Sequence, residues 1–203
     1  MADTRLTGLF RRLHSGLVGS TLGQADREAL AAFIIHKDES AFALLVQRHG
    51  PMVLRVCQRV LHHTQDAEDA FQATFLVLAR KAGAIGKTEA LASWLHGVAF
   101  RIALRARRDA GRRRARERQA AATAGADPAE ALAWRDVQVL LNAEIGRLPE
   151  HYRSAFVLCY LEGRSRAEAA ADLGVEENTL SSRLRNISSL CGSVGEPLRA
   201  GSI

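Results

Sequence analysis

The chain has 203 residues, of which 47% are hydrophobic and 25% are charged, so it can bury one large core or two small ones and is not a disordered protein. No run of about 18 apolar residues is present, so we expect no membrane-spanning helix. The three cysteines, Cys57, Cys159 and Cys191, lack the CxxC spacing of zinc sites and disulfide frameworks, and they fit a reducing cytoplasm.

Residues 1–28 are expected to form a loosely ordered leader or a short amphipathic helix. Arginines are mixed with leucines there, and the continuous apolar core of a secretory signal is missing. From Ala29 to Leu61, apolar residues recur at helical spacing, with Asp38 as a candidate N-cap and a break expected at Gly50-Pro51. The apolar stripe consists of Phe42, Leu45, Val46, Val53, Val56, Cys57 and Val60.

A second helix is expected to start near Asp66, because acidic residues in a first turn favour the helix dipole. Its inner face consists of Ala67, Ala70, Phe71, Thr74, Phe75 and Leu78. A loop over 83–88 separates it from a third helix that begins around Glu89. The apolar stripe of the third helix consists of Leu91, Trp94, Leu95, Val98 and Ile102.

The positive charge is concentrated after this stripe. The net charge of the chain is +6, but the nine arginines and two acidic residues between Arg101 and Arg118 carry +7, so the rest of the chain carries −1. Such a block favours a polyanion as the partner, with a solvated basic helix end as the alternative. Apolar periodicity is lost over 112–127, which predicts a flexible inter-domain linker between a domain at 29–111 and a domain at 128–203.

The second domain is also expected to be helical, which makes the whole chain all-α with two small domains. Its first helix follows Asp127-Pro128 and ends at Leu148-Pro149. The core positions expected in it are Leu132, Leu140 and Ile145. The next helix covers 150–162, and Gly163 is a natural stop.

The last predicted element is a helix-turn-helix. Ser165 and Glu168 have the spacing of a capping box, and Gly174 permits a tight turn before a helix that starts near Glu177. Small Ala170 allows the two helices to cross closely. The inner face of the second helix carries Leu180, Leu184 and Ile187. Its outer face carries residue types that reach bases and phosphates, with an ordinary helical hairpin as the alternative.

No enzyme motif accompanies these elements. The chain lacks a P-loop, a Rossmann glycine fingerprint, a nucleophile elbow and HExxH, and the adjacent His62 and His63 diverge on a helix. We therefore expect no catalytic residue, no metal site and no cofactor.

Two separate blocks carry a resemblance to a known family. The segment Asp66-Ala-Glu-Asp-Ala-Phe-Gln-Ala-Thr-Phe75 resembles the polymerase-binding helix of region 2 in sigma-70-family factors. Trp94-Leu-His-Gly-Val-Ala-Phe-Arg101 resembles the adjoining promoter-recognition helix. Leu148-Pro-Glu-His-Tyr-Arg153, Tyr160-Leu-Glu-Gly163 and the helix-turn-helix resemble region 4. Their order and spacing are similar to those of extracytoplasmic-function sigma factors, which keep these two domains.

This resemblance implies a non-catalytic RNA polymerase subunit with three binding surfaces. The helix around Asp66 would dock on the β′ coiled coil of core polymerase through Asp66, Glu68, Asp69 and Gln72. The minus-ten element, melted to a single strand, would be held by Lys87, Trp94, Arg101, Arg105 and Arg108. The minus-35 element would be read in the major groove by Asn178, Thr179, Ser181, Ser182, Arg183 and Arg185.

The family also implies further partners: the polymerase β flap and an anti-sigma factor. Many relatives have Asn where this chain has Arg101, and their recognition helix opens with Gly-Thr-Val where this chain reads Asn178-Thr-Leu-Ser181. Altered minus-ten preference and weaker minus-35 binding are the hypotheses that follow. No sensory domain is expected after the helix-turn-helix. The competing interpretations are a stand-alone helix-turn-helix regulator, which would need no polymerase dock, and an adaptor that binds no promoter.

Overall fold

The computed structural model describes residues 22–61, 63–85, 90–120 and 129–192, with side chains left undescribed at 22–24, 117–120, 129–135 and 188–192. The predicted all-α class is confirmed, because the described residues form helices and no strand. The first group of helices is α2 (Leu22–His36), α3 (Glu39–Val60), α4 (Thr64–Lys81), the 3₁₀ turn η1 (Ala82–Ala84) and α5 (Leu91–Ala120). The second group is α6 (Ala129–Arg147), α7 (Glu150–Phe156), the π-helical turn η2 (Val157–Leu161), α8 (Arg166–Leu173) and α9 (Glu177–Gly192).

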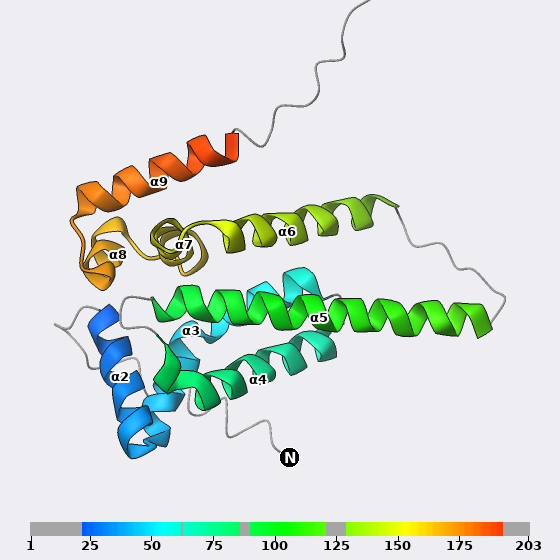
Figure 1. Cartoon of the computed structure of the whole chain (residues 1–203), viewed down its shortest axis with the longest axis horizontal. Coiled ribbons are helices and arrows are strands. Elements are labelled where there is room, and N and C mark those ends of the chain that lie inside the picture. The colour runs from blue at the N-terminus through cyan, green and yellow to red at the C-terminus, as the bar shows by residue number, and fades with distance from the viewer. Residues whose placement is uncertain (1–21, 62, 86–89, 121–128, 193–203) are drawn as a thin grey trace, which may run out of the picture.

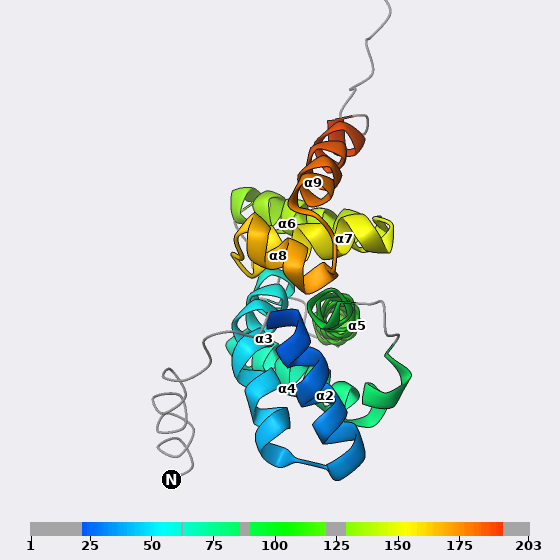
Figure 2. The same cartoon turned by 90° about the vertical axis from the view of Figure 1, so that its left-hand side faces the viewer.

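The two groups of helices stack on each other. In Figures 1 and 2, α6 to α9 lie on one side of the long helix α5, and α4 lies on its other side. Helix α8 lies next to the N-terminal end of α2, and α6 runs alongside α5 (Figure 1). A face of α5 is therefore shared between the two groups.

The core of the first group follows the predicted apolar stripes. Leu45, Val53, Leu78 and Leu95 are completely shielded from solvent, and they come from α3, α4 and α5. Cys57 is buried in the same core, and burial raises the pKa of its thiol to about 12, as expected for a buried free cysteine.

The first predicted cap is confirmed, whereas the predicted break is wrong. The Asp38 carboxylate accepts hydrogen bonds from the backbone amides of Ser40 (2.9 Å) and Ala41 (3.2 Å) and so starts α3. Helix α3 then continues through Pro51 to Val60. Met52 and Val53, next to the proline, are buried, so tertiary burial outweighs the loss of one backbone hydrogen bond.

The segment expected to be irregular is partly helical. Helix α5 continues through residues 112–120, because this arginine- and alanine-rich sequence has high helix propensity even without an apolar stripe. The remainder of the expected linker, 121–127, lies outside the described residues, as do nearly all of the leader, the loop at 86–89 with Lys87, and the side chain of Leu132. The division into domains at 29–111 and 128–203 stays a prediction.

The second group confirms the helix-turn-helix. Ser165 and Glu168 form the capping box, and Gly174 adopts φ +64° at the end of α8. Leu180, Leu184 and Ile187 of α9 are buried. The expectation that Leu140 lies in the core is wrong: it is 63% exposed on α6, whereas Ile145 is buried.

Candidate nucleic-acid interface

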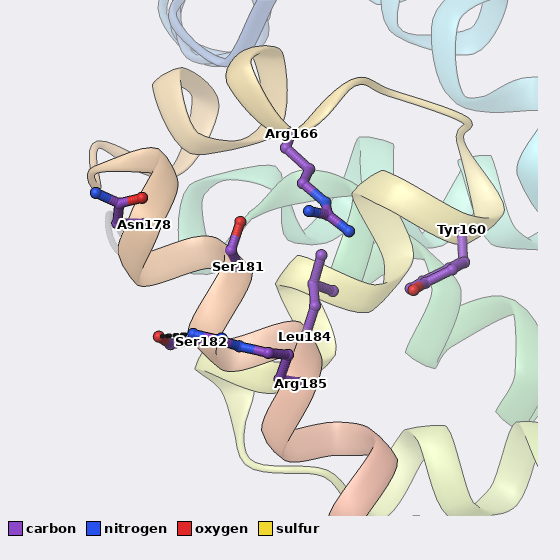
Figure 3. Close-up of a pocket in the computed structure, with 7 residues that line it drawn as sticks. All are labelled: Tyr160, Arg166, Asn178, Ser181, Ser182, Leu184 and Arg185. Atoms are coloured by element: carbon purple, nitrogen blue, oxygen red, sulfur yellow. Dashed lines mark hydrogen bonds between the residues drawn. The ribbon is translucent and has the colours of Figure 1, made fainter.

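The outer face of the helix-turn-helix is a polar, open surface. A pocket of about 410 Å³ is bordered by Tyr160, Arg166, Asn178, Ser181, Ser182, Leu184 and Arg185 (Figure 3). The side chains of Arg166 and Tyr160 extend toward α9 from α8 and η2 in this view. Burial of the opposite face of α9 turns its polar residues outward.

The six predicted minus-35 residues all lie on α9, with different exposure. Asn178, Thr179 and Arg185 are exposed, whereas Ser181, Ser182 and Arg183 are partly buried. One guanidinium nitrogen of Arg185 donates to the Ser182 hydroxyl at 3.2 Å (Figure 3). This weak contact on the surface leaves the guanidinium with donors that can reach an anion or a base edge.

The basic residues of α5 form a stripe along one side of that helix. Arg101, Arg105 and Arg108 are all exposed, and their spacing of four and three residues places them on one face. The guanidinium of Arg101 lies over Gly97, where a Cβ atom would stand 3.3 Å from its Nη1. The stripe therefore offers three cations to a polyanion.

Trp94 stands at the edge of this stripe and is partly buried. It lines a pocket of about 280 Å³ together with Ser93, His96, Gly97, Phe100, Arg101, Ala143, Gly146 and Arg153. The last three residues come from α6 and α7, so this pocket lies between the two groups of helices. The structure thus brings Trp94 and Arg101 together but places them next to the second group.

His96 beneath this pocket is a neutral imidazole. Burial lowers its pKa to about 4, and the hydrogen bond to Asn142 does not offset this effect. Because the Asn142 amide nitrogen donates to the carbonyl of Gln138, its oxygen is the atom that accepts from His96 Nε2 at 3.2 Å. His96 Nδ1 has no hydrogen-bond partner among the described residues.

The polar face of α4 lies on the far side of the first group. Glu68, Asp69 and Gln72 are exposed, whereas Asp66 is partly buried. Leu76, one turn after Gln72, extends this face and is 59% exposed. The sequence interpretation missed Leu76, although its place four residues after Gln72, outside the inner stripe, was a usable signal.

Known families and proteins match both groups of helices. The family model described as Sigma-70 region 2 matches residues 45–113, and the model described as Sigma-70, region 4 matches residues 138–188. The ECF RNA polymerase sigma factor SigM of Mycobacterium tuberculosis is 34% identical over 164 residues, which cover 79% of this chain and 79% of SigM. The chain belongs to the family of ECF RNA polymerase sigma factors.

Other sigma factors match over slightly less of the chain. ECF RNA polymerase sigma factor SigE of Mycolicibacterium smegmatis is 32% identical over 148 residues, which cover 69% of this chain and 56% of SigE. A solved structure described as CnrH in complex with the cytosolic domain of CnrY covers 86% of this chain and 97% of its own, with 22% identity and a TM-score of 0.37.

This membership assigns the class of function. The chain is an RNA polymerase sigma factor that acts in transcription initiation, and the alternative of a stand-alone helix-turn-helix regulator is not favoured. The matched region 2 contains the α4 and α5 faces, and the matched region 4 contains the helix-turn-helix. In the described part of the chain, no helix has the length and hydropathy needed to cross a membrane, and no group of metal-ligating side chains is found.

Proposed function

We propose that this sigma factor directs promoter-specific initiation by three separate surfaces and has no catalytic activity of its own. The polar face of α4 docks on the β′ coiled coil of core RNA polymerase. The basic face of α5 binds the melted minus-ten element, and α9 enters the major groove at the minus-35 element. Region 4 also contacts the polymerase β flap. We further propose a cytoplasmic location and control by an anti-sigma protein, both inferred from family membership.

The observation that supports minus-35 binding is the two-sided character of α9. Its apolar side is buried by the rest of region 4, and its polar side, from Asn178 to Arg185, faces solvent. A helix presented in this way after a short glycine turn can enter a major groove without losing its own core. The exposed Arg185 supplies a donor for a guanine edge or a phosphate.

Minus-ten binding is supported by the stripe of α5. Three exposed arginines follow one face of the helix, and Trp94 stands at the same face two turns before Arg108 is reached through Arg101. Cations along a groove hold a nucleic-acid backbone, and an aromatic ring next to them offers a stacking surface for an unpaired base. Arg101, at the centre of the stripe, is the residue expected to shift the base preference.

Polymerase docking is supported by the composition of the exposed α4 face. Two carboxylates and one amide, from Glu68, Asp69 and Gln72, surround the exposed Leu76. A polar rim around an apolar centre is the ordinary anatomy of a protein interface, and the carboxylates complement a basic partner. This face lies away from α6 to α9 (Figure 2), so region 4 does not cover it.

The experiment that tests this function is binding to purified core RNA polymerase, followed by run-off transcription on a pool of genomic fragments. Wild type is expected to bind core polymerase and to give discrete start sites. The double variant Glu68→Lys/Asp69→Lys is expected to lose core binding, because it reverses two charges on the docking face.

The matched control is Glu144→Lys, which reverses an exposed charge on α6 outside the docking face. Normal core binding by the control and lost binding by the double variant support the docking face. Binding to duplex DNA with no binding to core polymerase would instead show a regulator built from related parts.

A further inference from the structure

A network of buried charges joins region 2 to region 4. It consists of Asp26 on α2, Arg48 and His49 on α3, and Glu162, Arg164 and Asp172 in the segment from the end of η2 into α8. The exposed fractions of these side chains lie between 0% and 16%. Burial of six ionisable groups is costly unless they pair with one another, so the network depends on both domains being in place.

His49 is the centre of the network. Its Nδ1 lies 2.6 Å from Glu162 Oε1, and its Nε2 lies 3.0 Å from Asp26 Oδ2. A carboxylate oxygen can only accept, so both ring nitrogens must donate, and the ring is an imidazolium. Burial lowers the pKa of His49, but the carboxylates of Asp26 and Glu162 outweigh burial and raise it to about 9.

The other members complete the pairing. Arg48 pairs with Asp26, and Arg164 pairs with Asp172 and, at 2.9 Å, with Glu162. Arg164 also approaches the Asp26 carboxylate at 3.9 Å. With His49 charged, three cations face three anions, and the buried cluster is neutral. Neutralising one member leaves its partners as buried charges without full compensation, which favours separation of the domains and hydration of the charges.

The same closed arrangement covers part of the promoter-binding helix. Arg153 of α7 donates from Nε to the hydroxyl of Ser93 on α5 at 2.9 Å, and Asn142 of α6 accepts from His96. Ser93 and His96 are completely buried, and Trp94 is partly buried in the pocket between the domains. The α4 face lies on the opposite side and stays accessible (Figure 2).

We propose that the Asp26–His49–Glu162 cluster, with its three paired neighbours, is a latch that holds the free sigma factor closed and that must open before α5 binds promoter DNA. In the closed state the α4 docking face is free, whereas the Trp94 end of the α5 face is restricted by region 4. The latch rests on the proposed function for the role of these two faces. Its existence as a device that joins the domains does not depend on that function.

The experiment compares the full chain with Glu162→Gln, His49→Gln and the double variant. The radius of gyration from solution X-ray scattering reports closure. Fluorescence anisotropy with a labelled single-stranded oligonucleotide of minus-ten composition reports access to α5. If the closed state holds 90–99% of the wild-type molecules, opening raises the apparent DNA affinity by about 10- to 100-fold. The two single variants and the double variant are expected to reach the same level, because each opens one shared latch.

Two controls separate the latch from general charge loss. Glu144→Gln removes one carboxylate from an exposed pair inside region 4, and Asp136→Asn breaks the exposed pair with Arg107 across the same domain boundary. Both controls are expected to keep the wild-type radius of gyration and DNA affinity, because exposed pairs contribute little. Opening of the controls as fully as Glu162→Gln would overturn the proposal.

A second measurement covers the case in which the variants fail to fold, as judged by far-UV circular dichroism. Wild type is then compared at pH about 7 and about 10, where His49 loses its proton. The groups that face His49 are Asp26, Glu162 and Arg164, with Arg48 and Asp172 behind them, and no other member titrates in this window. An unchanged radius of gyration across this window would overturn the latch.

The outcomes for latch and function can be told apart. A larger radius of gyration with no change in core-dependent transcription by any form would retain the latch and remove the sigma role of the faces. Normal transcription by wild type, with variants that stay closed and bind DNA as wild type does, would retain the function and remove the latch.

Discussion

His49 Nδ1 lies 2.6 Å from Glu162 Oε1, although 113 residues separate these two side chains in the sequence. The contact joins α3 of region 2 to the residue that follows η2 in region 4. It lies in a buried environment in which both partners are ionised, so it is sensitive to any change of charge. The relative position of the two domains is thereby tied to the protonation of one imidazole.

The closed conformation is expected to be lost as the pH rises. The raised pKa of His49 means that its contribution to closure is fully present below about 6.5, its ordinary value, and is lost as the pH passes about 9. Burial raises the pKa of Asp26, but His49 and Arg48 outweigh burial and lower it, so its contribution is lost only under acidic conditions. The radius of gyration, measured as a function of pH, should rise near pH 9 in wild type. His49→Gln should show no such step, and an identical step in the variant would assign it to another group.

Arg185→Ala is expected to weaken binding of the sigma–polymerase complex to a matched promoter. Loss of a bidentate base contact costs about 1–3 kcal/mol, and loss of a phosphate contact lowers the salt slope by about one unit. Titrations of labelled promoter DNA at several salt concentrations measure both effects. The control Arg147→Ala removes an exposed arginine of region 4 that pairs with Glu144. Equal affinities for wild type and Arg185→Ala at all salt concentrations would mean that α9 does not read the minus-35 element.

Leu76→Ala is expected to weaken binding to an isolated β′ coiled-coil fragment by roughly tenfold, or about 1.4 kcal/mol, because it removes the apolar centre of the α4 face. Protein stability should hardly change, since the side chain is 59% exposed in the free protein. Surface plasmon resonance with the immobilised fragment measures the affinity. Ile35→Ala, at a 70% exposed position on α2, is the matched control and should bind as wild type. A similar loss in both variants would argue against a specific docking face on α4.

Ala170→Leu is expected to lower the free energy of unfolding of region 4 by about 1–3 kcal/mol, because it inserts three carbon atoms into a filled core. Ala170 is 3% exposed on α8, and its carbonyl accepts the amide of Val175 at 3.0 Å. Urea denaturation followed by circular dichroism measures the change. The neighbouring Ala171 is exposed, so Ala171→Leu should stay within about 0.5 kcal/mol of wild type. A tolerated Ala170→Leu would show that α8 and α9 do not cross closely at this residue.

Gly174→Ala is expected to destabilise the helix-turn-helix by about 1–2 kcal/mol, because a Cβ atom at φ +64° is strained. Gly174→Asn should cost less, since asparagine tolerates the left-handed region. Thermal unfolding of the two variants gives this order. Gly146→Ala on α6, where a Cβ atom would meet nothing within 4 Å, should be neutral or stabilising. The reverse order for alanine and asparagine would mean that the turn relaxes to another conformation.

Features with local causes could be predicted from the sequence. The cap at Asp38, the capping box at Ser165 and the turn at Gly174 each depend on a few neighbouring residues, and the structure confirms all three. Errors arose where burial or propensity outweighed a local signal. Pro51 stays within α3 because the residues after it are buried, and residues 112–120 continue α5 through their helix propensity.

The candidate site divides in the same way. The polar face of α9 and the arginine stripe of α5 follow from helical periodicity, which places residues three and four apart on one face. The exposure of Leu140 and Leu76 did not follow, because periodicity identifies a face but does not say what covers it. Trp94 is partly buried for a similar reason: α6 and α7 border the pocket that it lines.

The sequence by itself determined the all-α class, the helix-turn-helix and the family, because these depend on residue spacing along single helices. Only the tertiary structure decided that Asp26, His49 and Glu162 share one buried cluster, since no periodic pattern relates positions so far apart. It also decided that α4 stays free while α5 is partly covered. The physical reason is that the way one domain packs on another depends on the fit and charge of complete surfaces, which exist only after each helix has folded.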